Sequence, residues 1–245
     1  MPKFFVTQDK ISDNQIIIDS EDVTHISRVL RLEKGDNVTV CDGQGTDYDA
    51  QIDTIEPKKI LLNIISRQKS ETEPNIKVTL FQALPKASKM EYIIQKTTEL
   101  GISEIVPVKL SRCVVKIDNK KDEKKKIDRW QKIAESAAKQ SGRGIVPTVS
   151  EFMTEVIEKS KEFDLFFVPY ECEEQKTLKE ILTSKSDVKS VGFVIGPEGG
   201  FDLSETEKLH SSGIDTVTLG KRILRTETAG EAVLAMTMYE IGDIN

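Results

Sequence analysis

The chain has 245 residues, with 35 Lys and Arg against 41 Asp and Glu, and a formal net charge of −6. This length allows one or two domains with a sizeable core. The net charge excludes a uniformly basic nucleic-acid binder of the histone type, but it permits a local basic face. Charged residues at 31% and hydrophobic residues at 38% are typical of a soluble globular protein.

Three cysteines (Cys41, Cys113, Cys172) and two histidines (His25, His210) are the only residues of these types. An odd, widely spaced set of cysteines argues against a disulfide framework and favours a reducing compartment. No two of these five residues have zinc-ligand spacing, so we expect no metal site. Two histidines also leave little room for a histidine-based hydrolase.

The chain start, MPKFFVTQDK, has no long apolar stretch, and no segment approaches the roughly 18 apolar residues that a membrane span requires. We therefore expect a cytoplasmic protein with no signal peptide and no contact with a membrane.

The first 67 residues predict a small β-barrel. A helix that Ser20 can cap interrupts the strands, and the clearest turn is 42–45. The polar segment 68–75 is the best linker candidate. The predicted strands cover 4–6, 16–18, 38–40, 48–55 and 60–65.

After the linker, strands and helices alternate, which favours an α/β domain with a mostly parallel sheet. A capping box, Ser204 with Glu207, opens one of the helices, and Thr228 with Glu231 can cap the last. We expect strands at 76–83, 104–108, 113–116, 164–168, 190–195 and 215–219, and helices at 89–100, 123–140, 176–183 and 228–241, with one more after residue 204.

Positive charge is concentrated between Lys109 and Arg143, a segment that contains twelve basic and five acidic residues. This net charge of +7 lies within a chain of net charge −6. A solvated helix face and a nucleic-acid contact explain it about equally well on charge alone.

Two segments that follow predicted strands carry the most chemistry. Residues 195–201 read IGPEGGF, and residues 219–230 read LGKRILRTETAG. Ligands of open α/β sheets bind at the carboxyl ends of strands, where glycines let the backbone approach a ligand. Neither segment has the glycine spacing of a dinucleotide site or a Walker lysine, which disfavours a nucleotide-dependent enzyme. Taken alone, the first segment is explained better by an ordinary strand-to-helix turn, by about twofold.

Several segments together resemble the bacterial 16S ribosomal RNA uracil-N3 methyltransferases, the RsmE family of the SPOUT superfamily. The similarity runs in order through both halves of the chain. It rests on 25–32 with Gly35-Asp36 and Asp42-Gly43, on 82–86, 89–91, 95–101 and Arg112, on Arg129-Trp130 with Ala134, Ala138, Gln140, Ser141 and Arg143, and on 195–201 and 219–229.

The resemblance implies an α/β fold in two domains. Residues 1–70 would form an RNA-binding barrel similar to PUA domains. Residues 74–245 would form a SPOUT methyltransferase domain with a deep trefoil knot and the interface of a homodimer. Members of this family use S-adenosylmethionine, and by similarity the cofactor would be held by Ile195, Gly196, Gly199, Leu219, Gly220, Ile223, Leu224, Arg225 and Thr228.

Methyl transfer from a sulfonium is an in-line displacement that needs no metal, while uracil N3 must lose a proton before or during attack. We expect Arg225 to stabilise charge on the base, and Glu198 or Glu227 to accept the proton or to position the reacting groups.

The expected partner is 16S rRNA within the small ribosomal subunit. The predicted RNA contacts are Lys3, Arg28, Arg31, Lys86, Lys89, Arg112 and Arg143. Lys3 stands where relatives often have Arg, which keeps the charge but loses the bidentate fork. Two alternatives remain open: a related SPOUT methyltransferase that acts on a ribose 2′-hydroxyl or on tRNA, and a non-catalytic RNA-binding assembly factor.

Overall fold

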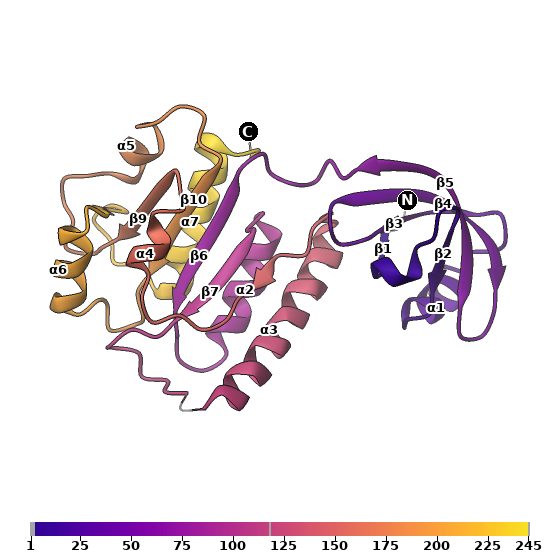
Figure 1. The fold of residues 1–245 in the computed structure, drawn as a ribbon, viewed down its shortest axis with the longest axis horizontal. Helices are drawn as coiled ribbons and strands as arrows, with labels where there is room; N and C mark the ends of the chain where they lie inside the picture. Colours follow the sequence, from indigo (N-terminus) through magenta and orange to yellow (C-terminus); the bar gives the residue numbers. More distant parts are fainter. Residues whose placement is uncertain (1–2, 118, 245) are drawn as a thin grey trace. The chain divides into compact units, whose positions relative to one another are not determined.

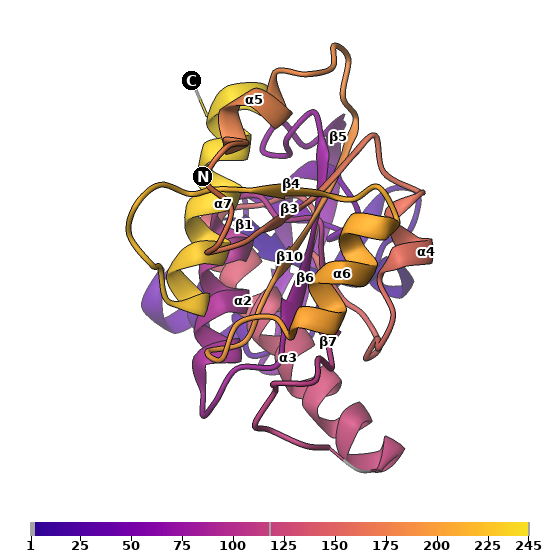
Figure 2. The same ribbon diagram turned by 90° about the vertical axis from the view of Figure 1, so that its left-hand side faces the viewer.

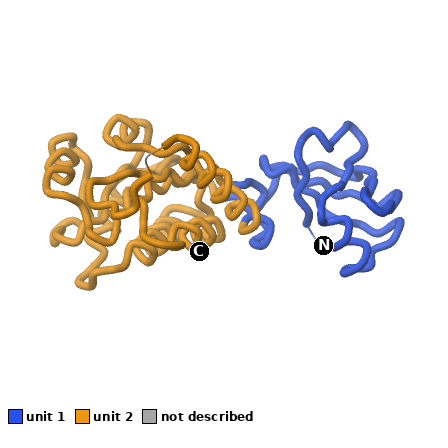
Figure 3. The backbone as a smooth tube through the Cα atoms, turned by 90° about the horizontal axis from the view of Figure 1, so that it is seen from below, with its two compact units in different colours: residues 1–73, 138–146 blue, residues 74–137, 147–245 orange. Residues whose placement is uncertain are grey.

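A computed structural model describes residues 3–117 and 119–244, and these form two compact units. Unit 1 contains residues 3–73 and 138–146, and unit 2 contains the remaining described residues (Figure 3). Segment 138–146 therefore groups with the first unit, whereas the predicted limits 1–70 and 74–245 assign it to the second domain. Residues 1, 2, 118 and 245 of those limits lie outside the described part of the chain. The limits stay a prediction about where the functional domains divide.

Unit 1 is built on a five-stranded sheet in the order β1-β3-β4-β5-β2 (Figure 1). Strand β1 pairs parallel with β3, and the other neighbours pair antiparallel. A short 3₁₀ turn, Gln8–Lys10, follows β1. The strands are β1 (Lys3–Phe5), β2 (Gln15–Ile18), β3 (Asn37–Cys41), β4 (Thr46–Ile55) and β5 (Ile60–Lys69).

The core of unit 1 follows from alternation along these strands. Ile16 and Ile18 on β2 are buried while Ile17 between them is exposed, which is the period-2 pattern of a sheet with one covered face. The helical segment α1 (Asp22–Thr24) continues as a π-helical turn (His25–Val29) and adds Val23 and Ile26 to this core. The predicted helix after Ser20 is thus present, and the Ser20 Oγ accepts a hydrogen bond from the Asp22 N–H at 3.2 Å.

Unit 2 contains a six-stranded sheet in the order β11-β9-β10-β6-β7-β8, and every neighbouring pair is parallel. The prediction of a parallel sheet is confirmed. The strands are β6 (Lys77–Ala83), β7 (Glu104–Val108), β8 (Thr148–Val149), β9 (Leu165–Pro169), β10 (Ser190–Ile195) and β11 (Asp215–Val217).

The predicted strand at 113–116 is wrong. These residues are irregular, with a bend at Val114, and the Cys113 N–H donates to the Leu110 carbonyl at 3.0 Å, so the backbone closes on itself instead of pairing with the sheet.

Helices cover both faces of the sheet in unit 2 (Figure 2). Leu80 and Phe81, adjacent on β6, belong to different core clusters: Leu80 packs with residues of α2, α3, α5 and α7, and Phe81 with residues of α4 and α6. None of the helices in residues 3–117 and 119–244 is long and apolar enough to cross a bilayer. They are α2 (Lys89–Glu99), α3 (Lys120–Ser141), α4 (Ile157–Ser160), α5 (Leu178–Leu182), α6 (Leu203–Ser211) and α7 (Thr226–Ile241).

Two predicted helix caps are wrong. The capping box of α6 consists of Asp202 and Glu205, not of Ser204 and Glu207, because Asp202 is the last residue in extended conformation before the helix. Helix α7 begins at Thr226, so Thr228 lies inside it. The N-cap of α7 is Arg225, which makes no side-chain cap.

A buried ion pair holds segment 138–146 within unit 1. The Arg143 Nη2 lies 2.6 Å from Glu73 Oε2, with exposed side-chain fractions of 5% and 11%. Glu73 Oε1 also accepts hydrogen bonds from the Gly144 and Ile145 N–H groups. Arg143 was expected to contact RNA. Because it is buried and committed to Glu73, we correct this expectation: Arg143 is a structural residue of unit 1.

Lys3 needs a similar correction. Its Nζ lies 2.9 Å from Asp47, with only 15% of the Lys3 side chain exposed, and it donates to the Gly142 carbonyl at 3.2 Å. Lys3 thus links β1 to β4 and to segment 138–146 inside unit 1, and its charge is not presented to a ligand.

The turn that follows β9 is fixed by Glu173. Its carboxylate accepts hydrogen bonds from the Thr216 Oγ1 at 2.7 Å and from the Gln175 and Lys176 N–H groups at 2.8 and 3.2 Å. These donors, led by the Thr216 hydroxyl, lower the pKa of Glu173 to about 2. The turn after β9 is therefore tied to strand β11.

Replacing Arg143 by Met should lower the free energy of unfolding by about 3 kcal/mol, because it leaves the Glu73 carboxylate buried without its cation. Urea unfolding followed by circular dichroism measures this. The matched control is Lys139→Met, which removes a more exposed pair with Asp22 at 3.6 Å and should cost less than about 0.5 kcal/mol. Equal, small effects of both variants would contradict the structural role of Arg143.

Replacing Glu173 by Gln should destabilise the protein at pH 7 by about 1–2 kcal/mol. Since the folded-state pKa of Glu173 is lowered to about 2, its contribution is fully present above its ordinary value of 4.5 and is lost as pH falls through about 2. The difference between wild type and Glu173→Gln should therefore shrink as urea titrations are repeated at decreasing pH. Glu174→Gln, at the exposed neighbouring position, is the control, and a pH-independent difference for Glu173→Gln would rule out this account.

Candidate functional site

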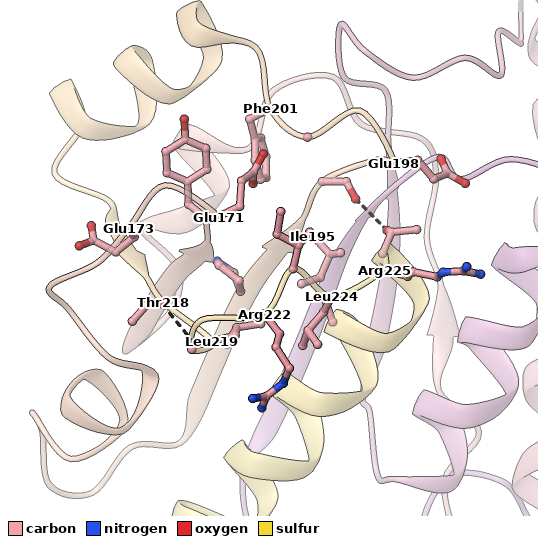
Figure 4. Close-up of a pocket in the computed structure, with 18 of the residues that line it drawn as sticks. Glu171, Glu173, Ile195, Glu198, Phe201, Thr218, Leu219, Arg222, Leu224 and Arg225 are labelled. Atoms are coloured by element: carbon pink, nitrogen blue, oxygen red, sulfur yellow. Dashed lines mark hydrogen bonds between the residues drawn. The ribbon is translucent and has the colours of Figure 1, made fainter.

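A cavity of about 920 Å³ lies in unit 2 where three neighbouring strands end. Its walls come from the segments after β9 (169–174), β10 (195–201) and β11 (218–226), with Lys89 and Ala229 added (Figure 4). Because β9, β10 and β11 are parallel, their carboxyl ends share one edge of the sheet and the three segments converge there. This volume suits a small organic ligand.

Thr226 ties the loop after β10 to the first turn of α7. Its hydroxyl donates to the Gly196 carbonyl at 2.7 Å and accepts from the Gln82 Nε2 at 2.9 Å. Gln82 and Thr226 are buried, so this chain of hydrogen bonds is shielded from water. At Gly196 a Cβ would meet the Phe201 ring at 3.1 Å, so this residue leaves little space for a side chain.

The segment after β11 lies open on the cavity. Gly220 has φ +97°, and its N–H donates to the Thr218 Oγ1 at 3.2 Å. Leu219 and Leu224 pack against the core, whereas the Ile223 side chain is 87% exposed although it lines the cavity. The cavity therefore has an apolar floor with an exposed apolar residue at its rim.

Most of the predicted cofactor residues line this cavity, and two do not. The predicted residues on the wall are Ile195, Gly196, Leu219, Gly220, Ile223, Leu224 and Arg225. Gly199 faces Arg112 instead: a Cβ on it would lie 3.5 Å from the Arg112 side chain, and the Arg112 Nη1 donates to its carbonyl at 3.1 Å. Thr228 is exposed on α7 and is absent from the wall.

One wall of the cavity, the segment after β9, is not predicted from the sequence. Tyr170, Glu171 and Glu174 follow that strand, and Tyr170 packs edge-on to Phe201 with ring centroids 6.4 Å apart. No glycine-rich turn marks this segment. The signal that would have found it is positional: it follows the carboxyl end of a strand that neighbours β10.

Three charged side chains meet at one end of the cavity. The Lys89 Nζ lies 3.1 Å from Glu198 Oε1 and 3.0 Å from Glu227 Oε2. Figure 4 shows Glu198 and Arg225 at this end and Glu171 and Glu173 at the opposite end. The structure therefore brings both predicted catalytic carboxylates together around one ammonium group.

Hydrogen bonding to Glu227 and Glu198 raises the pKa of Lys89. Burial alone would raise the pKa of both carboxylates, but backbone N–H groups and Lys89 outweigh it and lower the pKa of Glu198 and of Glu227. All three groups are therefore charged at neutral pH.

Four predicted RNA contacts are exposed. Arg28 and Arg31 lie on unit 1, and Lys86 and Arg112 on unit 2. Arg112 also reaches Asp202 at 3.4 Å, and the Lys86 backbone N–H donates to Glu198 Oε1 at 3.0 Å. The remaining prediction on unit 2, Lys89, lies within the charged cluster.

In residues 3–117 and 119–244, no group of three or more His, Cys, Asp and Glu side chains is arranged to hold a metal ion. The three cysteines are free, with Cys41 and Cys113 buried and Cys172 exposed. Burial raises the pKa of the Cys41 thiol to about 12, so this thiol is neutral and unreactive at physiological pH.

Residues 72–238 match the family described as RNA methyltransferase domain, and residues 18–65 match the RNA methyltransferase PUA domain. The ribosomal RNA small subunit methyltransferase E of Bacillus subtilis is 35% identical, over 98% of this chain and 97% of its own length. Its namesake from Mesomycoplasma hyopneumoniae is 32% identical, over 94% and 95%.

Solved structures are similar over the whole length. The ribosomal RNA small subunit methyltransferase E of Neisseria gonorrhoeae, bound to S-adenosylmethionine, is 30% identical with a TM-score of 0.84, and each chain is fully covered. A methyltransferase of Legionella pneumophila, also in complex with this cofactor, is 28% identical with a TM-score of 0.84, over 99% of each chain. The cavity at the carboxyl ends of β9, β10 and β11 thus lies within a domain of known type, and this chain belongs to the RNA methyltransferase family, with an N-terminal PUA domain.

Proposed function

We propose that this protein transfers a methyl group from S-adenosylmethionine to N3 of a uridine in 16S rRNA of the small ribosomal subunit. The observation that carries the proposal is the cavity at the carboxyl ends of β9, β10 and β11, in a chain that matches the RNA methyltransferase family along most of its length. The names of the relatives and the cofactor in two similar structures support the substrate and the methyl donor.

The residues of the cavity suit this cofactor. Ile195, Leu219 and Leu224 offer apolar surface for an adenine ring, and the open backbone around Gly220 offers groups that can read its edge. Glu171 on the opposite wall brings negative charge to a ligand that carries a sulfonium and an ammonium group. We assign the binding of the cofactor to Ile195, Gly196, Leu219, Gly220, Ile223, Leu224 and Arg225.

When bound, S-adenosylmethionine supplies an electrophilic methyl group, and the protein has to orient the base and manage a proton. Uracil N3 is protonated at neutral pH, and its loss of a proton leaves negative charge on O2 and O4. Arg225, exposed at the rim, is placed to stabilise that charge. Glu198 and Glu227 are ionised at the same end of the cavity, where they can accept the proton or position the reacting groups.

RNA binding should involve exposed cations on each unit. Arg28 and Arg31 serve on unit 1, and Lys86 and Arg112 on unit 2. In the described residues, Lys120, Lys121, Lys124 and Lys132 on α3 are exposed and form no ion pair, which adds a row of free charge suited to phosphates. Affinity for the small subunit should therefore fall steeply with salt concentration. The target base must be unstacked or already single-stranded to reach the cavity.

A homodimer through α2 and α7 fits the surface of unit 2. Helix α7 is apolar on nearly all sides, which is typical of a helix that is covered all round. Yet Met236 and Tyr239 are 41% and 70% exposed, and Tyr92 on the adjoining α2 is 47% exposed. The Glu231 Oε1 in this region is buried without a hydrogen-bond partner among the described residues. Sedimentation analysis that finds only monomers would contradict the dimer.

We also propose a closed PUA-like barrel for unit 1 and a deep trefoil knot for unit 2. The strands of unit 1 share one hydrophobic core, which supports the barrel, and closure would bring together β1 and β2, the two ends of the strand order. In unit 2, β11 lies at the edge of the sheet, while α7, which follows it, packs against the central strands β10 and β6. This return toward the middle of the sheet supports a knotted path, and a crystal structure with an unthreaded chain would overturn it. Because the proposed substrate is part of the ribosome, we also propose that the protein is cytoplasmic.

Calorimetric titration with S-adenosylmethionine tests the cofactor site. Wild type should show saturable binding, and Gly196→Trp should abolish it, because the added side chain fills space beside Phe201 and the cavity. Thr228→Trp adds the same bulk on the exposed face of α7 and should bind like wild type. A wild type that fails to bind, even with small subunits present, would favour the non-catalytic assembly factor.

Nucleoside mass spectrometry of small subunits treated with protein and cofactor tests the reaction. Methylated N3 of uridine is the expected product, whereas methyl groups on ribose or on tRNA alone would favour the related methyltransferases. With the cofactor at saturating concentration, Arg225→Ala should lower kcat by about 100-fold or more. Unchanged turnover in this variant would remove Arg225 from the mechanism.

A further inference from the structure

Lys89, Glu198 and Glu227 come from three separate parts of unit 2 and meet at one point. Lys89 is the first residue of α2, Glu198 belongs to the loop after β10, and Glu227 is the second residue of α7. The ammonium group lies about equally far from the two carboxylates, at 3.1 and 3.0 Å. One side chain thus connects both segments that border the cavity at this end.

Burial makes this connection stronger than an ordinary surface ion pair. The exposed side-chain fractions are 30% for Lys89, 25% for Glu198 and 17% for Glu227. Glu227 Oε2 is itself buried and, among the described residues, makes no hydrogen bond beyond its pairing with Lys89. Without Lys89 this oxygen would be left buried next to a second carboxylate, which is costly.

The backbone before α2 supports the same arrangement. Ala87 has φ +55°, a left-handed conformation that a residue with a side chain rarely adopts. Next to this residue, the Lys86 N–H donates to Glu198 Oε1 at 3.0 Å, so that oxygen receives both a backbone donor and the Lys89 ammonium. Strained backbone that persists beside a functional cavity indicates a geometry that its neighbours enforce.

The cluster lies on the outside of a second, buried connection between the same segments. Inside the protein, the Thr226 hydroxyl joins the first turn of α7 to Gly196. Outside, Lys89 joins Glu227 of the same turn to Glu198, two residues after Gly196. Between them, these contacts fix the separation of α7 from the loop after β10, and with it the width of the cavity at this end.

We propose that Lys89 is a positioning residue that sets the shape of the cofactor cavity, and not an RNA contact as the sequence indicates. Its charge is already neutralised by two carboxylates, so it has little to offer a phosphate. This inference rests on the proposed binding of S-adenosylmethionine in the cavity. Arg225, which lines the cavity and is exposed, remains available to the base.

The test compares calorimetric titrations of S-adenosylmethionine, without RNA, for wild type, Lys89→Met, Lys89→Arg and Lys86→Met. Lys89→Met should weaken binding by about tenfold or more, as expected when a partly buried ion pair loses one member. Lys89→Arg should recover most of the affinity, because its fork can reach both carboxylates. Lys86→Met is the matched control: only its backbone contacts Glu198, so it should bind the cofactor like wild type.

A double-mutant cycle separates positioning from general loss of stability. Lys89→Met combined with Glu227→Gln should weaken binding no more than Lys89→Met alone, because both changes act through one contact. Amide hydrogen exchange supplies a readout without ligand: exchange at 198–200 and 86–89 should accelerate in Lys89→Met and stay unchanged in Lys86→Met.

Lys89→Met that binds cofactor like wild type but loses affinity for small subunits would overturn the inference and restore Lys89 as an RNA contact. Additive effects in the cycle, or unchanged amide exchange, would also overturn it. Failure of wild type to bind the cofactor, with or without small subunits, would instead overturn the proposed function, and the exchange measurement would still decide whether Lys89 holds the two segments together.

Discussion

Every segment that lines the cavity leaves the carboxyl end of a strand in one parallel sheet, and the site depends on this constraint. Parallel pairing of β9, β10 and β11 places residues 169, 195 and 217 at the same edge, although long stretches of chain separate them. An antiparallel neighbour would send one of these segments to the far edge. The local glycine turns then decide only how closely the backbone approaches a ligand there.

Convergence alone leaves the loops free to move, and two contacts of different kinds limit that freedom. The buried Gln82–Thr226–Gly196 hydrogen bonds are neutral and dry, so they are insensitive to salt and pH. The Lys89 cluster is charged and partly wet, so it responds to both. Together they connect β6 to the loop after β10 and to the first turn of α7, and the last two border the cavity.

The sequence predicts what local chemistry determines. The apolar run 190–195 followed by IGPEGGF identifies a strand with a loop at its end, and the structure has both. The spacing of apolar residues in 89–100 likewise predicts α2. Cap positions were misplaced by two residues at α6, because Ser204 and Asp202 are both good cap residues and only the backbone conformation chooses between them.

What the sequence could not provide is pairing across long separations. Nothing near Arg143 in the sequence shows that it forms a buried ion pair with Glu73, seventy residues away, so the basic segment around Arg143 predicts an RNA contact. The same holds at the cavity. The sequence predicts that Lys89 is a surface lysine, and only the structure shows that it is paired with Glu198 and Glu227.

These cases share one physical cause. The role of a charged side chain depends on its surroundings in the fold. A side chain that is paired with an opposite charge stabilises the structure, whereas one that faces only solvent remains available to a ligand. Among the described residues, Lys120, Lys121, Lys124 and Lys132 of α3 form no ion pair, so their charge is available to a partner. The charges of Arg143, Lys3 and Lys89 are instead paired within the fold. The basic surface that RNA would contact is therefore smaller than the sequence indicates. Which cations are paired within the fold, and so do not belong to that surface, can be decided only from the three-dimensional structure.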